Sequence, residues 1–177
     1  YIFDADWNGE VVAESSIDNS KTYLGLHFPA SDIPKQARDL YYQKPARYIP
    51  NVDYQPQKII PDDLDKEGHP IDLSIINSRS ISPIHQNYMK NMGISGSTSF
   101  AVFKNNTLCG LVICHSKTSN YIEPHIRALA HDLVVLYSAL LSASDLKAAE
   151  AAENSKQECM TKLAHAIRNP DEKGEVI

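Results

Sequence analysis

Apolar residues recur at alternate positions in some segments of this chain and at three- and four-residue steps in others. Alternation predicts strands and the longer steps predict helices. Residues 1–13 are predicted to form a β-hairpin with its turn at Asn8-Gly9. Residues 22–50 predict an extended stretch and then a helix, which Ser31 or Asp32 can cap and whose first turn can include Pro34. Residues 51–78 show little periodicity and predict a long ordered loop, a feature that often carries function.

The segment RSISPIHQNYMKNMG, residues 79–93, has the boundaries of a short helix. Ser82 can cap it, Pro83 stands at its first position and Gly93 follows its last apolar residue. Helical steps place five of its side chains in one stripe that is expected to face inward: Ile84, His85, Tyr88, Met89 and Met92. A histidine that titrates near neutral pH is therefore predicted on an apolar face.

Two further strands are predicted at about residues 95–103 and 108–115, joined around Asn105-Asn106. A long helix then starts at Glu123, with an apolar seam of heptad spacing: Ile126, Leu129, Leu133, Leu136 and Leu140. Residues 147–168 continue this helix with a thinner apolar face. These elements predict an α+β fold, an antiparallel β-sheet with flanking helices of the PAS/GAF kind followed by a long C-terminal helix.

Composition narrows the class of protein. With 177 residues, 42% hydrophobic and 22% charged, the chain is predicted to form one globular domain with an appendage. A net charge of −5 argues against a nucleic-acid partner, and no apolar run has the length of a membrane span. Cys109, Cys114 and Cys159 lack CxxC spacing, which favours a reduced, cytoplasmic protein without zinc. The first residues already read as a strand, so we interpret the chain as a fragment that begins inside a domain.

Several polar residues stand where a core would have none: His85, His115, Arg47, Arg79 and the serines at 97 and 99. Each alone has an ordinary structural explanation, such as a core histidine with its hydrogen bonds made or an arginine paired with a surface acid. Burying the whole set is costly unless partners are supplied. A ligand with anionic groups and an extended apolar surface would supply them. No nucleophile motif is present, and Cys114 and His115 point to opposite faces of one strand, so no enzyme active site is expected in this segment.

Several blocks resemble the chromophore-binding GAF domain of phytochromes. They are PASDIP at 29–34, YIFDADWNGEVVAE, YLGLHFPASDIPKQAR, RSISPIHQNYMKNMG and GLVICH, in that order and over about residues 1–141. The SPIHxxY form is more similar to bacteriophytochromes. The resemblance implies a bound linear tetrapyrrole (bilin), biliverdin or alternatively phycocyanobilin. It also implies red/far-red sensing by Z/E isomerisation at the D-ring, with signalling through the C-terminal helix. Residues 1–144 would be the GAF domain, and 145–177 a helical linker or the start of a PHY or output domain.

The resemblance also implies roles for individual residues. Asp32 would offer its backbone carbonyl to the pyrrole NH groups and its carboxylate to a switching contact, His85 would lie over the central rings, and His115 would bond the D-ring carbonyl. The two propionates would be bound by Arg47 and Arg79, helped by Tyr41, Ser82, Ser97 and Ser99. The D-ring would be bordered by Tyr1, Phe28 and Tyr88. Two further residues, Ile33 and Met92, would pack on the bilin.

This chain lacks the cysteine through which part of the family attaches the bilin covalently. Plant and cyanobacterial phytochromes carry the linking Cys directly before this histidine, where this chain has Ile84. In bacteriophytochromes the linking Cys lies in an N-terminal PAS segment, which this chain lacks. Non-covalent binding is therefore expected, unless the Cys lies in missing residues.

Other functions stay open at this stage. The chain could be a non-photosensory GAF module that binds another small ligand such as a cyclic nucleotide, or a dimerisation module of a sensor histidine kinase. CMTKLAHAIRNP, residues 159–170, resembles a phosphoacceptor box at His165 and also suits a linker into a PHY domain. A homodimer through the C-terminal helix is expected, with a response regulator as a partner of a missing kinase domain.

The pairing register of the predicted strands 95–103 and 108–115 decides whether Ser97 and Ser99 lie on the same face as His115, as the predicted site requires. A two-residue turn at Asn105-Asn106 would place Ser97 and Ser99 on the face of Cys114. A three-residue or bulged turn would place them on the face of His115. We predict the longer turn.

Overall fold

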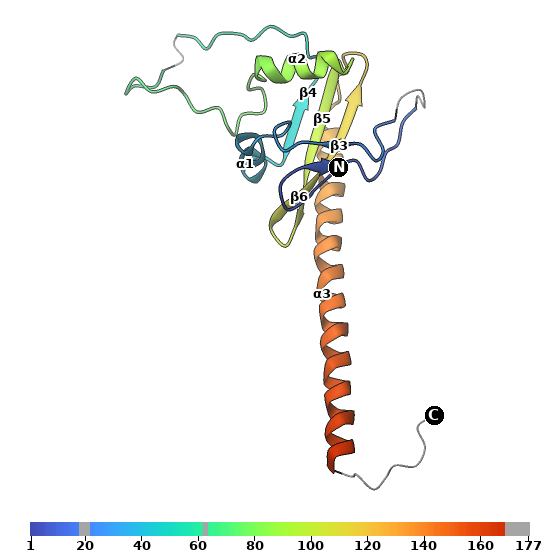
Figure 1. Cartoon of the computed structure of the whole chain (residues 1–177). Coiled ribbons are helices and arrows are strands. Elements are labelled where there is room, and N and C mark those ends of the chain that lie inside the picture. The colour runs from blue at the N-terminus through green and yellow to red at the C-terminus, as the bar shows by residue number, and fades with distance from the viewer. Residues whose placement is uncertain (18–21, 62–63, 169–177) are drawn as a thin grey trace. The chain divides into compact units, whose positions relative to one another are not determined.

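The computed structural model describes residues 1–17, 22–61 and 64–168, the last five of these as backbone only. The described chain falls into two compact units, 1–138 and a second that begins at Ala139. The first unit contains the whole β-sheet and the two short helices (Figure 1). The side chain of His165 lies outside the described residues, as does the sequence after Arg168.

Six antiparallel strands form one sheet in the order β3-β2-β1-β6-β5-β4. The strands are β1 (Ile2–Phe3), β2 (Gly9–Glu10), β3 (His27–Phe28), β4 (Ala46–Ile49), β5 (Gly96–Lys104) and β6 (Thr107–Ser116). The predicted α+β fold is confirmed. The first hairpin also forms, with Phe3 opposite Gly9. Its turn is not at Asn8-Gly9, because Gly9 already pairs within β2 and the Asp4 carboxylate, accepting from the Asn8 N–H at 2.8 Å, closes the connection before it.

The β5–β6 hairpin reaches the expected register by a different route. Lys104 pairs with Thr107, so the turn has two residues, Asn105 and Asn106, with φ of 50° and 62°. The three-residue turn of the prediction is therefore wrong, whereas its bulged alternative is confirmed by the pairing further along the strands. Further along, Val102 pairs with Gly110 but Phe103 pairs with Leu108, which leaves Cys109 as a β-bulge. The bulge shifts the register by one residue, and every pair beyond it is displaced.

Helix α1 (Lys35–Gln43) follows Pro34 directly, without a side-chain cap. The predicted cap by Ser31 or Asp32 is wrong. Arg38 instead ties the helix to the preceding loop, because its Nη1 donates to the Ile33 carbonyl at 2.6 Å. Proline cannot donate a backbone hydrogen bond, so a helix that starts after Pro34 has one fewer terminal donor to satisfy.

Helix α2 (Pro83–Asn91) begins as predicted, with Pro83 at its first position and the Ser82 hydroxyl accepting from the His85 N–H at 3.2 Å. Gly93 follows with a φ of +73°, a value that favours glycine. The inward stripe holds only in part. Met89 is 2% exposed, but Ile84 is 83% exposed and points to solvent, and His85 and Tyr88 are exposed as well. Ile84 lies in the first turn, beyond the cluster of buried side chains that Met89 joins.

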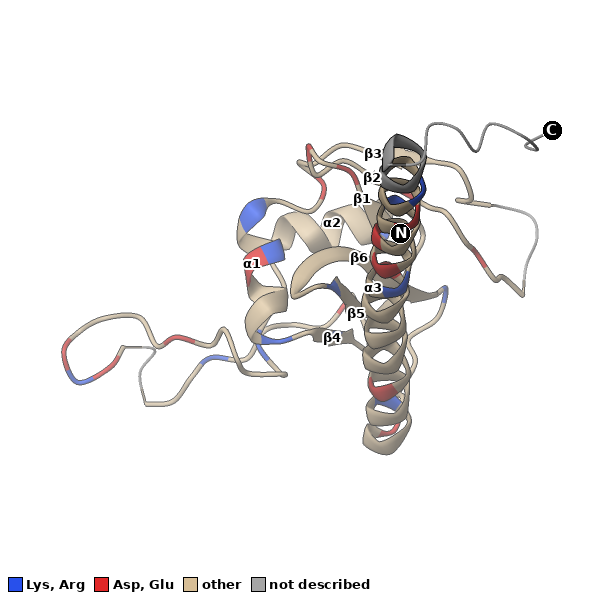
Figure 2. Cartoon of the chain, turned by 90° about the horizontal axis from the view of Figure 1, so that it is seen from below, with Lys and Arg blue, Asp and Glu red and all other residues tan. Residues whose placement is uncertain are grey.

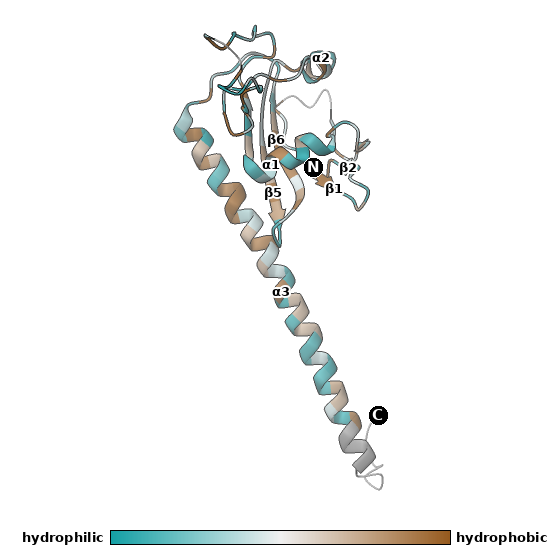
Figure 3. Ribbon diagram, turned by 90° about the vertical axis from the view of Figure 1, so that its left-hand side faces the viewer, coloured by the Kyte–Doolittle hydropathy of each residue, from teal (hydrophilic) through white to brown (hydrophobic). Residues whose placement is uncertain are grey.

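The two faces of the sheet have different coverings. Ser99 contacts Tyr41 of α1, whereas its neighbour Phe100 has its ring 6.4 Å from that of His131 in α3. Figure 3 accordingly shows α1 and the first turns of α3 on opposite sides of β5 and β6. The α1–α2 face carries most of the predicted site residues, and we call it the site face.

Helix α3 runs unbroken over Pro124–Arg168, which confirms the predicted long helix and its continuation. By length and composition alone, its stretch Pro124–Leu163 contains a window of 18 residues, with a mean hydropathy of 1.4, that could cross a membrane, so the prediction of no segment of that kind was wrong. Its first turns nevertheless pack on the sheet. The Arg127 guanidinium lies 4.4 Å from the centre of the Tyr48 ring, and the Ser138 hydroxyl accepts from the Phe103 N–H at 3.1 Å. These contacts are those of a helix in a globular domain.

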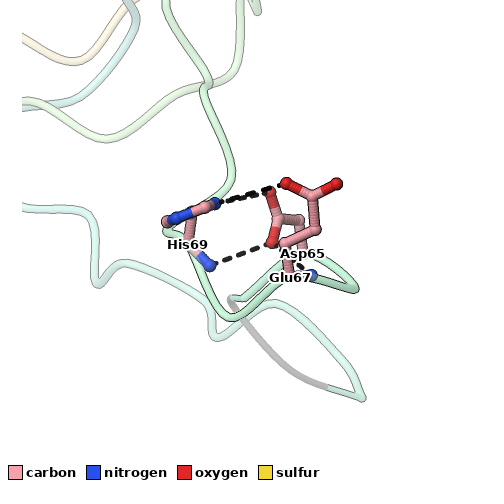
Figure 4. Close-up of polar contacts among 3 residues, drawn as sticks. All are labelled: Asp65, Glu67 and His69. Carbon is pink, nitrogen blue, oxygen red and sulfur yellow. Dashed lines mark hydrogen bonds and ion pairs between the residues drawn. The ribbon is translucent and has the colours of Figure 1, made fainter.

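The long loop between β4 and α2 contains a small closed turn. Leu64 and Pro70 form an isolated β-bridge, and the Asp65 carboxylate accepts from the backbone N–H groups of Glu67 and His69 at 2.8 and 2.9 Å. The His69 ring lies 3.7 Å from both carboxylates (Figure 4). Among the described residues this is the one group of side chains at metal-ligand separation, and all three are exposed. Figure 2 shows the other charged residues spread over α1, α3 and the loops.

Candidate functional site

Two arginines on the site face have no acidic partner. Arg47 of β4 donates from Nη2 to the Arg79 carbonyl at 2.7 Å and from Nη1 to the Asn77 carbonyl at 3.4 Å. Arg79 donates to the Ile76 carbonyl at 3.2 Å. Burial, and after it the charge of Arg79, lowers the pKa of Arg47. No carboxylate among the described residues forms an ion pair with either guanidinium, so this guanidinium pair presents uncompensated positive charge.

Hydroxyl groups lie beside this guanidinium pair. The Tyr41 hydroxyl and Ser99 Oγ are 2.7 Å apart, and Ser99 stands opposite Arg47 in the β4–β5 ladder. Burial raises the pKa of Tyr41, so its hydroxyl stays protonated and able to donate. Ser97 lies on the same face two residues along, whereas the Ser82 hydroxyl is engaged in capping α2. Guanidinium and hydroxyl donors together form a site for a carboxylate or phosphate.

Two histidines lie further along the same face. Burial, and after it the charge of Arg47, lowers the pKa of His85; burial, and after it the charge of His85, lowers the pKa of His115. Both side chains still reach solvent. The influence of His85 on His115 places the two near one another, and their lowered pKa values keep both imidazoles neutral at pH 7. A neutral imidazole offers one donor and one acceptor to a ligand.

A phenol and a carboxylate connect α2 to the loop before α1. The Tyr88 hydroxyl donates to Asp32 Oδ2 at 3.2 Å. Burial, followed by the negative charge of Asp32, raises the pKa of Tyr88 to about 12. The Tyr88 ring also lies parallel to that of His85, with centroids 6.4 Å apart. The PASDIP segment and the predicted helix of residues 79–93 therefore meet at this point, as a shared binding site requires.

Aromatic rings from the first and third strands close this end of the site face. The Tyr1 and Phe28 rings are 6.1 Å apart at an angle of 49°. Burial, and after it Asp32, raises the pKa of the Tyr1 phenol, which places Tyr1 near the Tyr88–Asp32 pair. The Tyr1 ring lies against Gly9, where a Cβ atom would come within 1.8 Å of Tyr1 Cζ. Only glycine leaves room for the ring in this position.

The two remaining predicted residues pack on buried clusters. Ile33 contacts a cluster that includes Leu108 and Leu111, and Met92 contacts one that includes Met89. Both are only partly buried, so each retains some exposed surface.

One positioning residue was missed from the sequence. Arg38 donates to the carbonyls of Ala30 and Ile33, and its guanidinium lies 4.5 Å from the centre of the Trp7 ring. It thereby fixes the loop that carries Asp32. Its place four residues after Pro34, in the first turn of the helix, is the signal that could have indicated this role.

No protein-family model matches the chain. Among curated proteins, it is 41% identical over 166 residues to cyanobacterial phytochrome B of Nostoc sp., which covers 94% of this chain and 21% of the relative. It is 42% identical over 127 residues to a bacteriophytochrome of Xanthomonas campestris pv. campestris, which covers 72% of this chain and 20% of the relative. The chain thus spans about a fifth of the length of these relatives.

Solved structures give the same match. The chromophore-binding domain of a Stigmatella aurantiaca phytochrome aligns with a TM-score of 0.72 and 43% identity, over 80% of this chain and 46% of that one. A bacteriophytochrome from the photosynthetic bacterium R. palustris aligns with a TM-score of 0.80 and 34% identity, over 98% of this chain and 34% of that one. At these identities the similarity extends beyond the fold to the sequence.

Proposed function

This chain belongs to the phytochrome family, and on that premise we propose that it senses red and far-red light through a bound linear tetrapyrrole. The relatives it matches are phytochromes, and the similar structures include chromophore-binding domains. Because the chain spans only part of those proteins, light sensing is a proposal for the protein to which this segment belongs.

The observation that carries the proposal is the uncompensated positive charge of Arg47 and Arg79. Two guanidinium groups, partly buried and bonded, within the described part of the chain, only to backbone carbonyls, call for two anionic groups from a ligand. A bilin has two propionates. Tyr41, Ser82, Ser97 and Ser99 would add hydroxyl donors around them.

The other residues on the site face suit the rest of such a ligand. His85 and the backbone carbonyl of Asp32 would hold the pyrrole nitrogens, and His115 would donate to the carbonyl of the terminal D-ring. Tyr1, Phe28 and Tyr88 would border that ring, with Ile33 and Met92 packing on the conjugated system. The neutral state of both histidines and the protonated state of Tyr88 fit these donor and acceptor roles.

When bound, the tetrapyrrole supplies the light absorption and the Z-to-E isomerisation at its D-ring. The chain's own residues orient it, keep its hydrogen bonds and offer the Tyr88–Asp32 contact as one that can exchange between two arrangements. Biliverdin is the bilin we propose, with phycocyanobilin as the alternative. We propose non-covalent binding within this segment, because residue 84 is Ile and its side chain points to solvent.

The test is to add biliverdin to the protein and record the absorption spectrum. A sharp red band that changes reversibly under red and far-red light is the expected result. A spectrum identical to that of free biliverdin, with no response to either wavelength, would reject photoreception for this segment. A competition arm with a cyclic nucleotide checks the non-photosensory alternative, since displacement of biliverdin would indicate a shared site for another anion.

We also propose that α3 forms a homodimer. Four leucines of its heptad seam are more than half exposed: Leu129, Leu133, Leu136 and Leu140. An exposed apolar seam of this spacing is typical of a helix with a helical partner. Signal output through α3, a histidine kinase domain, a response regulator partner and a cytoplasmic location are proposals for the whole protein. So is the choice between phosphoacceptor and linker at His165.

A further inference from the structure

A cavity lies on the face of the sheet opposite the site face. It is an open hollow with a volume of about 340 Å³, lined by residues in and just before β4, in β5, in the long loop and in the first turns of α3. Tyr48 and Phe100 form its floor, and Arg127, Ala128 and His131 form its helical wall. Pockets that hold small molecules begin at about 300 Å³ and are mostly apolar with a few polar groups. The dimensions and lining of this cavity therefore suit a compact ligand.

The charge around this cavity is of one sign. Lys44, Arg47 and Arg127 line it and no Asp or Glu does, although the Arg47 guanidinium itself is engaged on the Asn77 and Arg79 carbonyls beside the site face, which leaves Lys44 and Arg127 as the cations of the cavity. The Lys44 ammonium has no ion-pair or hydrogen-bond partner among the described residues. Arg127 uses Nε on the Ile122 carbonyl at 3.0 Å and one face of its guanidinium on the Tyr48 ring. Its terminal nitrogens donate to no described residue. Positive charge that no lining carboxylate neutralises favours an anionic ligand.

A histidine atom in the same wall lacks a partner. His131 Nε2 is buried and makes no hydrogen bond, and it is the one orphan of this kind among the described side chains. Its other ring nitrogen lies 3.7 Å from an oxygen of Asp132, which leaves Nε2 as the free side of the ring. A buried polar atom without a partner requires an explanation, since the loss of its hydrogen bond to water on burial costs free energy that no new hydrogen bond offsets. His131 also lines the cavity, and a ligand there would become the partner of Nε2 after a shift of the ring, since the atom itself has almost no accessible surface.

From the cavity, its unpaired cations and the orphan His131 nitrogen, we propose that this chain has a second ligand site for a small organic anion. The ligand class is a carboxylate or phosphate ester on a compact, preferably aromatic body. Its anionic group would lie between Lys44 and Arg127, and its apolar body would lie on Tyr48 and Phe100. The proposal is independent of pigment binding, because it uses the opposite face of the sheet and residues outside the proposed bilin set except for Arg47 at its rim.

The probe is phenyl phosphate, with benzoate, inorganic phosphate and neutral phenol as comparison ligands. Binding is followed on ¹⁵N-labelled protein through the His131 ring nitrogens and the amide of Thr98. Phenyl phosphate should give saturable shifts at both places. Phenol, which has the ring without the charge, should bind at least about tenfold more weakly, because it makes no charge-assisted hydrogen bonds. Stronger binding of benzoate would assign the cavity to carboxylates, and stronger binding of inorganic phosphate would assign it to free phosphate.

Lys44→Gln and Arg127→Gln should each weaken phenyl phosphate about tenfold or more, whereas Lys66→Gln on the exposed long loop serves as the control and should change nothing. The red band with biliverdin should persist in Lys44→Gln, which separates this proposal from the proposed light-sensing function. Equal affinity in Lys44→Gln and Lys66→Gln would overturn the second site, as would equal affinity for phenol and phenyl phosphate. If Arg127→Gln unfolds, Lys44→Gln alone decides, because its ammonium makes no described contact.

Discussion

Ser97 lies directly opposite His115 on neighbouring strands, and the bulge at Cys109 is what brings them to the same face. Without that extra residue, the two-residue turn at Asn105 and Asn106 would pair Ser97 with Cys114, and His115 would point to the other face of the sheet. One residue far from the site face therefore determines which side chains of β6 reach it.

Deleting Cys109 should abolish pigment binding. The deletion removes the bulge, so residues 110–116 must shift by one position and turn His115 and Ile113 away from the site face. The red band with biliverdin should disappear while far-UV circular dichroism still reports a folded sheet. Cys109→Ser is the matched control, since it keeps the bulge and should keep the band. A deletion variant that binds biliverdin normally would show that the register is unimportant.

Replacing Arg47 with Gln should weaken biliverdin binding by about tenfold or more, because a charge-assisted contact to a propionate is lost from a partly buried site. Arg47→Lys should restore part of the affinity, since it keeps the charge but not the paired donors. Titration of the absorption band measures both dissociation constants. Unchanged affinity in Arg47→Gln would remove this residue from the propionate site.

The pKa of His85 in the pigment-free protein should lie below its ordinary value of 6.5. Burial is the larger cause and the charge of Arg47 the second, so Arg47→Gln should raise this pKa without restoring 6.5. Because the folded pKa is the lower one, the associated stability is present above pH 6.5 and is lost as the pH falls through the folded value. NMR titration of the His85 ring in both proteins checks that the pKa is lower in the unmodified protein than in Arg47→Gln. A midpoint for His85 above 6.5 would contradict the burial described for it.

His85→Ala should also change the bound pigment. The protonated fraction of the bilin near neutral pH should fall, because the variant loses a hydrogen-bonding group beside the pyrroles. The pH dependence of the red band measures this fraction. An identical titration curve in the variant would refute the role proposed for His85.

Tyr88→Phe should remove a pH dependence at alkaline pH. The folded pKa of Tyr88 is about 12 against an ordinary value of 10.0, so the unfolded chain loses this proton first. The stability linked to Tyr88 is thus present below pH 10 and declines as the pH rises toward 12. The difference in unfolding free energy between the two proteins should shrink across this range. A difference that stays constant would mean that Tyr88 ionises alike in both states.

Leu133→Asp should convert a dimer to a monomer, since Leu133 lies in the heptad seam of α3 and is 59% exposed. Val135→Asp is the matched control, because Val135 is 52% exposed but lies off the seam. Sedimentation velocity gives the oligomeric state of each. Equal behaviour of the two variants would reject the seam as the interface.

Local signals predicted the elements that depend on neighbouring residues. Ser82 and Pro83 indicated the start of α2, and its cap is formed as expected. The bulge at Cys109 was predicted only as an alternative to a three-residue turn, because Gly110 beside it suits a bulge but only the pairing with β5 reveals where it lies. The exposure of Ile84 was missed for a related reason. A helical stripe fixes direction around the axis but not how far along the helix the core extends.

Other parts of the site depend on contacts across the fold. Arg47 donates to the Arg79 carbonyl and Tyr88 donates to Asp32. Both hydrogen bonds depend on how a long loop and two helices meet. The resemblance to phytochromes named these residues, but their hydrogen bonds and charge balance come from the arrangement in space. Asp32 could equally have capped α1, as its position suggested, and it is Tyr88 that it contacts instead.

The contact between Gly9 and Tyr1 has a consequence for sequence variation. The Tyr1 ring occupies the space that any side chain at residue 9 would need. Among related sequences, a larger residue at this position should therefore appear only together with a smaller one at position 1. Residue 9 would then indicate, from sequence alone, which relatives have given up the aromatic ring at this end of the pigment site.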